Sequence, residues 1–329
     1  MTHAAAALAR LAEIPGLTVL ENAPMSRYTR FGIGGAADVL VGTSDAAAFA
    51  KALEIAHASG LATVVIGDGT NLIVADEGFR GVVLRLRSAS IHAEGTRVFV
   101  EGGATLQSLV DFTVAHGLKG LETMTGIPGS VGAAIYGNAG AYGHSIMERV
   151  DRVAFLDGGL DGGRTREFTN AECEFRYRES IFKRHKEWII VRAELTMEPG
   201  DAVALSETST KILDTRNKKY PPTMKCAGSI FKNLLLAELP ERIAKELPAN
   251  AIIEGKVPSA WFLDQAGAKG MREGDIQVAT YHANLIYNDG AGTARDLVKV
   301  IDCLKARVRE RFGIEIEEEV QYVGFAGRI

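Results

Sequence analysis

The sequence predicts an α+β protein with more than one domain, and three observations support this. The chain has 329 residues, which is long for a single hydrophobic core. A capped helix, a short strand and a glycine turn follow one another between residues 44 and 71. From about Val150 the pattern changes to strands, and the last third ends with a well-marked helix. We therefore expect two or three domains that combine helices with strands.

The first predicted elements lie between residues 44 and 117. A helix is predicted after the cap Ser44-Asp45, because apolar residues recur at helical spacing until Gly60 ends the pattern. A short buried strand at 62–66 leads into the glycine turn at 67–71. The GxGxxG dinucleotide fingerprint is absent there, which argues against a Rossmann site. Further predicted elements are strands at 81–86 and 97–101 and a helix at 106–116, capped by Thr105 and ended by Gly117.

The second half begins with strands predicted at 150–156 and 188–197. A helix at 206–217 leads to Tyr220-Pro221-Pro222, a candidate boundary because consecutive prolines cannot continue a helix. The last helix begins at the cap Thr293, carries Asp296 at its third position and ends at Gly313. A final strand is predicted at 314–324.

Composition narrows the class of protein. Hydrophobic residues make up 47% and charged residues 24%, as in ordinary globular proteins, and the net charge of −4 argues against nucleic acid as the main partner. No apolar run approaches the ~20 residues that span a bilayer, and Met1–Leu17 lacks the basic flank of a signal peptide. The three cysteines lie far apart and the seven histidines show no metal-ligand spacing. We expect a cytoplasmic protein without disulfides or a metal site.

The segment 125–143 is the most informative part of the chain. Six glycines fall within these nineteen residues, and none of the side chains is charged. Such a segment can bring its bare backbone close to a large flat ligand and donate N–H groups to it. Glycine density alone fits a surface loop equally well. The apolar residues Ile127, Val131, Ile135 and Tyr136 favour a buried turn system against a cofactor.

Three polar blocks could carry chemistry. Arg178 follows Tyr177, and a guanidinium offers paired donors that suit a carboxylate or an enolate; the alternative is a surface cation. Ser229 follows Gly228 and would present a hydroxyl at a tight turn that enters a buried strand, although a plain turn serine fits as well. The third block is an acidic run in the last strand, for which a solvated edge is the alternative: Glu315, Glu317, Glu318 and Glu319.

Five blocks, in order from about Tyr28 to Gly324, carry a resemblance to a known family. They are residues 67–72, 126–143, 177–182 and 228–233 and the pair Glu319-Val320. On these residues the chain closely resembles the UDP-N-acetylenolpyruvoylglucosamine reductase family, flavoenzymes that complete UDP-N-acetylmuramic acid for peptidoglycan.

The resemblance implies a fold and a cofactor. It implies an FAD-binding region of the vanillyl-alcohol-oxidase type in two subdomains, at 1–75 and 76–219, and an α+β substrate domain at 220–329. Because no histidine lies between Gly60 and Arg80, FAD is expected to be held without a covalent bond. The residues implied to bind FAD are Gly67, Asp68, Gly69, Thr70, Asn71, Leu72, Thr125, Gly126, Pro128, Gly129, Ser130, Gly132, Ala133, Asn138, Ala139 and Gly140.

The resemblance also implies a reaction in two halves. NADPH reduces the flavin, and hydride then passes to the methylene carbon of the enolpyruvyl ether while the adjacent carbon takes a proton. The implied roles are stabilisation of the enolate-like intermediate by Arg178 and Glu319 and proton donation by Ser229. Tyr177, Lys232 and Asn233 are implied to bind the substrate, UDP-N-acetyl-3-O-(1-carboxyvinyl)-glucosamine. We expect a monomer that binds neither membrane nor nucleic acid.

Some points stay open at the level of sequence. Strict alternation in the last strand turns Glu318 toward the core, whereas the family pattern selects Glu319. Only residues 184–187 separate the Tyr-Arg block from the next strand, so the chain resembles the short-form class, which lacks a tyrosine lid. Whether 234–258 covers the substrate is undecided. The alternative functions are an alcohol-oxidising flavoenzyme of the same superfamily and a nucleotide-binding module without catalysis.

Overall fold

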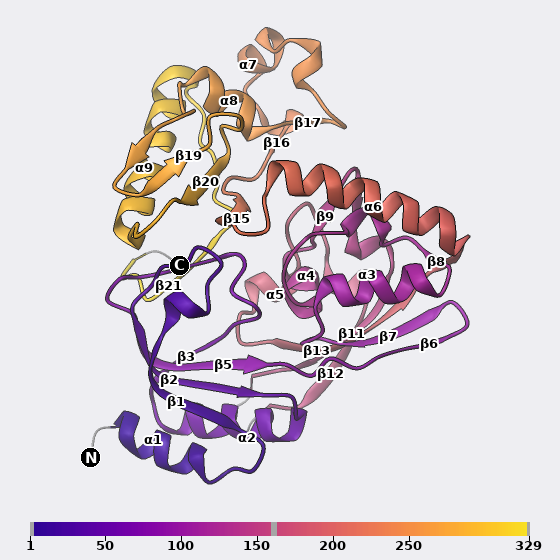
Figure 1. Ribbon diagram of the computed structural model, residues 1–329, viewed down its shortest axis with the longest axis vertical. Helices are drawn as coiled ribbons and strands as arrows, with labels where there is room; N and C mark the ends of the chain where they lie inside the picture. The colour runs from indigo at the N-terminus through magenta and orange to yellow at the C-terminus, as the bar shows by residue number, and fades with distance from the viewer. Residues whose placement is uncertain (1–2, 159–162, 328–329) are drawn as a thin grey trace. The chain divides into compact units, whose positions relative to one another are not determined.

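The computed structural model describes residues 3–158 and 163–327, which divide into two compact units (Figure 1). Unit 1 comprises Met1–Ala23, Ala37–Asp68 and Arg80–Pro221, and unit 2 comprises Pro24–Ala36, Gly69–Phe79 and Pro222–Ile329. The predicted division at 1–75, 76–219 and 220–329 stays a prediction, and its residues 1–2, 159–162 and 328–329 lie outside the described residues.

The first sheet of unit 1 has the strand order β1-β2-β5-β3. Its elements are β1 (Thr18–Pro24), β2 (Ala36–Thr43), β5 (Phe79–Leu86) and β3 (Ala62–Val65), with helices α1 (His3–Ala12) and α2 (Ala46–Ala58). Leu11 of α1 and Phe49 of α2 join the buried cluster formed by the strands. Asp45 caps α2 as predicted, its carboxylate accepting from Ala48 N at 2.8 Å. The strand after α2 is present, but it is half exposed rather than buried because it forms an edge of the sheet.

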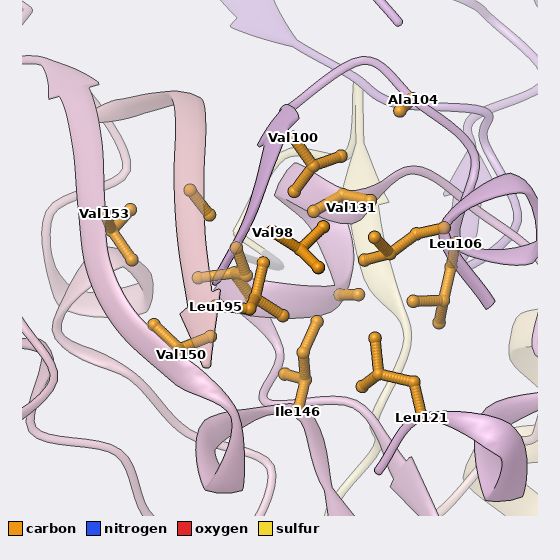
Figure 2. Close-up of a cluster of buried hydrophobic side chains, with 14 of the residues drawn as sticks. Val98, Val100, Ala104, Leu106, Leu121, Val131, Ile146, Val150, Val153 and Leu195 are labelled. Carbon is orange, nitrogen blue, oxygen red and sulfur yellow. The ribbon is translucent and has the colours of Figure 1, made fainter. Parts of the chain in front are cut away.

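The second sheet of unit 1 is antiparallel and has the strand order β12-β11-β13-β7-β6. Its strands are β12 (Thr165–Thr169), β11 (Val150–Leu156), β13 (Ile189–Thr196), β7 (Arg97–Glu101) and β6 (Ile91–Glu94). Helix α3 (Leu106–Ala115), capped by Thr105 as predicted, and the short helix α4 (Val131–Tyr136) pack on it. Figure 2 shows Val98 and Val100 of β7 beside Leu106 and Val131 in this core.

The remaining elements of unit 1 connect and flank these sheets. They are β8 (Leu118–Lys119), β9 (Gly140–Ala141), β10 (His144–Ser145), α5 (Ile181–Arg184), β14 (Glu198–Pro199) and α6 (Ala202–Lys219). Helix α6 begins four residues before the predicted start at Ser206, because Asp201 caps it by accepting from Ala204 N. The apolar pattern missed this first turn because only Leu205 of α6 is buried.

Unit 2 contains an antiparallel sheet with the order β15-β20-β19-β18. The helices and strands of unit 2 are β4 (Leu72–Val74), β15 (Lys225–Ser229), β16 (Leu234–Leu235), α7 (Glu241–Glu246), β17 (Lys256–Val257), α8 (Ser259–Gln265), β18 (Arg272–Glu273), β19 (Ile276–Val278), β20 (Leu285–Asn288), α9 (Ala294–Phe312) and β21 (Gln321–Val323). The predicted last helix is confirmed as α9, with a capping box between Thr293 and Asp296 and Gly313 in the left-handed region at φ 68°.

The predicted final strand at 314–324 is largely wrong. Only β21 is a regular strand, and it pairs in parallel with β4. The preceding residues 317–319 instead lie alongside 230–232: Lys232 N donates to Glu317 O at 2.9 Å, and Glu319 N donates to Ile230 O at 2.7 Å. The alternation of buried residues nevertheless runs from Ile314 through Ile316 to Val320, and it is lost only in β21, where Val323 is buried instead of Tyr322.

Among the residues that the structure describes, no helix combines the length and the apolar character needed to cross a membrane.

Candidate active site

The two glycine-rich segments meet within unit 1. A Cβ built on Gly67 would lie 2.6 Å from Ser130 Oγ and 3.5 Å from Ala133 Cβ, so the backbone of the first block lies directly against the second. The second block is more than the predicted turn system, because it contains helix α4, whose first turn Ser130 caps, and the hairpin β9–β10. Val131 and Ile135 are buried as expected.

The backbone N–H groups of this junction differ in what they bind. Gly126 N donates to Gln107 Oε1 at 2.7 Å and Gly132 N to Gly102 O at 2.8 Å, so the protein itself uses these donors. Within the described residues, no hydrogen bond to protein is made by four other N–H groups, those of Gly67, Asp68, Gly129 and Ser130. Buried or half-buried amides of this kind need an acceptor, and the phosphates of a nucleotide cofactor provide one.

Other glycines in the two blocks are required by the protein's own packing. A Cβ on Gly69, in unit 2, would lie 1.8 Å from Tyr28 O, and one on Gly140 would lie 2.2 Å from His144 O. Gly129 has a φ of +119°, which excludes branched residues without regard to space. Part of the glycine density that the sequence attributed to a cofactor is thus required by close backbone packing within the protein.

The remaining predicted cofactor residues are distributed over both units. In unit 1, Thr125 is buried and its hydroxyl donates to Glu122 O, Pro128 and Ala133 are exposed, and Ala139 is half-buried. In unit 2, Gly69, Thr70, Asn71 and Leu72 form the segment that leads into β4.

Arg178 occupies a strained four-residue turn in unit 1. Arg176 and Glu179 exchange backbone hydrogen bonds of 3.0 and 3.1 Å, and Arg178 sits between them with a φ of +56°, which is rare for a bulky residue. Its guanidinium donates to Asn138 O at 3.2 Å and to Gly140 O at 2.7 Å and lies 5.3 Å from the ring centre of Tyr177. The predicted pair Tyr177-Arg178 is thus fixed against the glycine-rich block.

The neighbouring Tyr136, at the end of α4, stays neutral. Burial, together with the charge of Glu179, raises the pKa of the Tyr136 phenol to about 12. Its carbonyl accepts from Ser180 Oγ at 2.7 Å, which ties the end of the arginine turn to α4. The Tyr136 phenol therefore brings no charge to this turn.

Ser229 lies at the end of β15, in unit 2, rather than before a strand as predicted. The register between β15 and β20 shifts between Cys226 and Ser229, and Gly228 within this bulge has a φ of +77°. The segment after Ser229 is fixed by Asn284, which is 2% exposed and whose Oδ1 accepts from Ile230 N at 3.2 Å and Phe231 N at 2.9 Å. Sequence reasoning missed Asn284, because no local pattern marks an amide that binds a segment 53 residues away.

Glu319 lies on the segment next to Ser229. Its N–H donates to Ile230 O, and its carbonyl accepts from Asn71 Nδ2 at 2.9 Å. The structure thereby brings together Ser229, Glu319 and Asn71, all within unit 2, whereas Arg178 belongs to unit 1. Asn71 was expected to bind the cofactor, and its side-chain donor is used to hold the glutamate segment.

Two of the three other glutamates of the acidic run, Glu317 and Glu318, are paired with lysines. Lys305 of α9 binds both carboxylate oxygens of Glu318 at 3.1 Å, and the Glu318 side chain is 15% exposed. Lys232 Nζ lies 2.6 Å from the exposed carboxylate of Glu317, and Asn233 Oδ1 accepts from Ser259 N at 3.3 Å. Alternation was right that Glu318 turns inward, and α9 provides the opposite charge for it.

Comparison with known proteins identifies both parts of the chain. Residues 37–166 match the family model of an FAD binding domain, and residues 220–323 match that of the UDP-N-acetylenolpyruvoylglucosamine reductase, C-terminal domain. These matches confirm the predicted fold class, an α+β chain with an FAD-binding region followed by a C-terminal domain.

Individual relatives extend the match over nearly the whole chain. The UDP-N-acetylenolpyruvoylglucosamine reductase of Solibacter usitatus is 62% identical over 315 residues, covering 96% of this chain and 100% of that protein. The same enzyme of Rubrobacter xylanophilus is 37% identical, covering 92% and 94%. The crystal structure of the Thermus caldophilus enzyme is 26% identical with a TM-score of 0.70 and covers 93% of this chain and 98% of that one. The chain therefore belongs to the UDP-N-acetylenolpyruvoylglucosamine reductase family.

Proposed function

We propose that the chain reduces the enolpyruvyl ether of UDP-N-acetylglucosamine to UDP-N-acetylmuramate, a step of peptidoglycan synthesis. Members of this family are flavin-dependent oxidoreductases, and this chain uses FAD with NADPH as the electron donor. Within the molecule, the observation that carries the proposal is the pairing of the Ser229 and Glu319 segments. In this pairing, the backbone of Glu319 lies against that of Ile230, the residue after Ser229, within unit 2.

FAD fits the residues of the glycine junction. The unused N–H groups of Gly67, Asp68, Gly129 and Ser130 suit its phosphate oxygens, and the missing Cβ of Gly67 lets the two segments approach. We propose these backbone groups as the main anion contacts of FAD. When bound, FAD supplies the hydride chemistry, and the protein supplies position and field.

The three proposed catalytic residues have distinct roles. Reduction places negative charge beside the substrate carboxylate, so a fixed guanidinium at Arg178 stabilises that charge where it develops. Ser229 gives its proton to the substrate carbon next to the one that receives the hydride. Glu319, whose N–H donates to Ile230 O beside that serine, stabilises the enolate-like intermediate together with Arg178. We propose that Tyr177, Lys232 and Asn233 bind the sugar nucleotide. The Lys232 ammonium, which now pairs with the exposed carboxylate of Glu317, would bind a phosphate of the substrate instead.

The setting of the enzyme follows from the same proposal. We infer that the protein is a cytoplasmic monomer whose partner is a small nucleotide-sugar, without nucleic acid or membrane as a partner. The net charge of −4 supports the absence of a nucleic-acid role. We also propose that 1–75 and 76–219 form the two FAD subdomains and 220–329 the substrate domain.

The function is tested by absorbance and by one assay. The purified protein is expected to be yellow with flavin absorption bands, which a plain nucleotide-binding module would lack. NADPH oxidation should require the enolpyruvyl sugar nucleotide, with UDP-N-acetylmuramate as the product. An enzyme that is reduced by an alcohol and ignores the sugar nucleotide would instead establish the alcohol-oxidising alternative.

A first prediction concerns the glycine junction. Gly67→Ala should weaken FAD binding, because the added methyl would lie 2.6 Å from Ser130 Oγ and push the two segments apart. Overpacking of this kind costs about 1–3 kcal/mol, or roughly 5- to 150-fold in affinity. FAD affinity of the apoprotein, measured by flavin fluorescence quenching, checks the effect.

The matched control is the double variant Gly67→Ala, Ser130→Ala. It removes the clashing hydroxyl and leaves only contacts of 3.5 Å or more at the new methyl, so it should recover much of the lost affinity. Ser130→Ala alone measures the loss of the α4 cap, typically ~1 kcal/mol. Wild-type FAD affinity in Gly67→Ala would exclude this junction from the cofactor site.

A further inference from the structure

Asn138 is placed where it can control the conformation of Arg178. It follows α4 in unit 1, is 2% exposed and has a φ of +42°, a conformation that asparagine tolerates better than most residues. Its side-chain amide is engaged with protein atoms on both sides. Nδ2 donates to Arg176 O at 2.8 Å and contacts Met147 Sδ at 3.2 Å, and Oδ1 accepts from Met147 N at 3.3 Å.

These contacts join Asn138 to both parts of the arginine turn. The side chain holds the carbonyl of Arg176, the first residue of the turn, and the main-chain carbonyl of Asn138 accepts from Arg178 Nη1 at 3.2 Å. Gly140 O, two residues further on, accepts from Nη2 at 2.7 Å. The segment 138–140 therefore fixes both the first residue of the turn and the position of the Arg178 guanidinium.

The turn needs such an anchor because its conformation is unfavourable. Arg178 has a φ of +56°, in a region that a bulky side chain adopts only where the surroundings impose it. A guanidinium is rigid and planar, so fixing two of its N–H groups also fixes the directions of its remaining N–H groups. Loss of the Asn138 amide would let the turn relax and displace the charge.

We propose that Asn138 is a positioning residue for Arg178, holding the strained turn so that the guanidinium is preorganised for the charge formed during substrate reduction. This inference rests on the proposed function for the role of Arg178. It differs from the sequence-based expectation, in which Asn138 binds FAD. The two interpretations predict different results. If Asn138 binds FAD, its loss should impair both half-reactions, because both need the bound flavin. If Asn138 positions Arg178, its loss should impair only reduction of the substrate.

The test uses two variants and a matched control in the full-length holoenzyme. Asn138→Asp keeps the shape and removes the Nδ2 donor, and Asn138→Gly keeps the positive φ and the main-chain acceptor but removes the amide. Asn170→Asp is the control, because Asn170 Nδ2 also donates to two half-buried carbonyl groups, those of Met147 and Val150, and makes no hydrogen bond to the arginine turn among the described residues. Stopped-flow absorbance resolves the two half-reactions of each variant.

Both Asn138 variants should slow substrate reduction by about 10²-fold, as small displacements of a positioned group do, with flavin content and NADPH-dependent reduction within about twofold of wild type. Asn170→Asp should leave the two half-reactions in their wild-type ratio. In an Arg178→Ala background, Asn138→Asp should add almost no further loss, since the group that it positions is gone. Additive losses, or loss of FAD with equal slowing of both half-reactions, would overturn the proposal.

One readout is independent of activity. Amide hydrogen exchange at Glu179, whose N–H closes the turn on Arg176 O, should be accelerated at least about tenfold in Asn138→Asp and unchanged in Asn170→Asp. Unchanged exchange at Glu179 would refute the positioning role even if activity fell. A wild-type protein that does not reduce the enolpyruvyl substrate would refute the proposed function and leave the exchange result standing.

Discussion

Ser229→Ala should slow substrate reduction by ~10²–10⁴-fold, the usual range for loss of a general acid. Reduction of the bound flavin by NADPH should be almost unchanged, because it takes no proton from Ser229. The structure supports a selective effect, since Ser229 ends β15 at a glycine bulge and the residues after it are held by Asn284 through backbone groups. Single-turnover absorbance traces of the flavin measure each half-reaction separately.

The serine variant needs a control for nonspecific damage. Ser108→Ala removes a hydroxyl that is exposed on α3 and bonded only to Thr105 among the described residues, so both half-reactions should keep their wild-type rates. Equal slowing of the two half-reactions in Ser229→Ala would indicate general damage and remove Ser229 from its proposed role.

Glu319→Gln should lower the rate of substrate reduction by ~10²-fold or more, since it keeps the shape of the side chain and removes its charge. Flavin content should stay normal, because the main-chain contacts of Glu319 with Ile230 and Asn71 do not involve the carboxylate. The same single-turnover measurement applies. Wild-type turnover in Glu319→Gln would exclude this carboxylate from the catalytic group.

Glu318→Gln is the matched variant one residue away. It should leave both half-reactions unchanged and lower thermal stability, because Lys305 Nζ would lose the half-buried carboxylate of Glu318, whose two oxygens it now binds. The loss should be about 1 kcal/mol or somewhat more, given the partial burial of the pair. If Glu318→Gln instead lost substrate reduction and Glu319→Gln did not, the two residues would exchange their assigned roles.

The contrast between these glutamates shows where sequence reasoning was limited. Alternation correctly indicated that Glu318 points inward, but a buried carboxylate can serve catalysis or pair with a cation. Lys305 lies 13 residues earlier on α9, and only folding places it beside Glu318. The predicted regular strand also fails near residue 318, because this segment pairs through isolated hydrogen bonds with 230–232.

Elements whose signals are local were predictable from the sequence alone. The caps at Asp45, Thr105 and Thr293 and the terminating Gly313 each act through a hydrogen bond or a backbone angle within a few residues, so their helices were found with nearly correct bounds. The motif blocks likewise determined the family, because their residues, order and spacing are properties of the sequence itself.

The tertiary structure decided which groups meet. Gly67 lies against Ser130, Asn138 reaches Arg176, Asn284 reaches Phe231 and Asn71 reaches Glu319, across separations of 38 to 248 residues for the three amides. Side-chain amides bond equally well to solvent, a ligand or a distant backbone, so their residue type does not predict the partner. The partner is chosen when burial removes water and each amide must bond to whatever polar backbone the fold brings beside it.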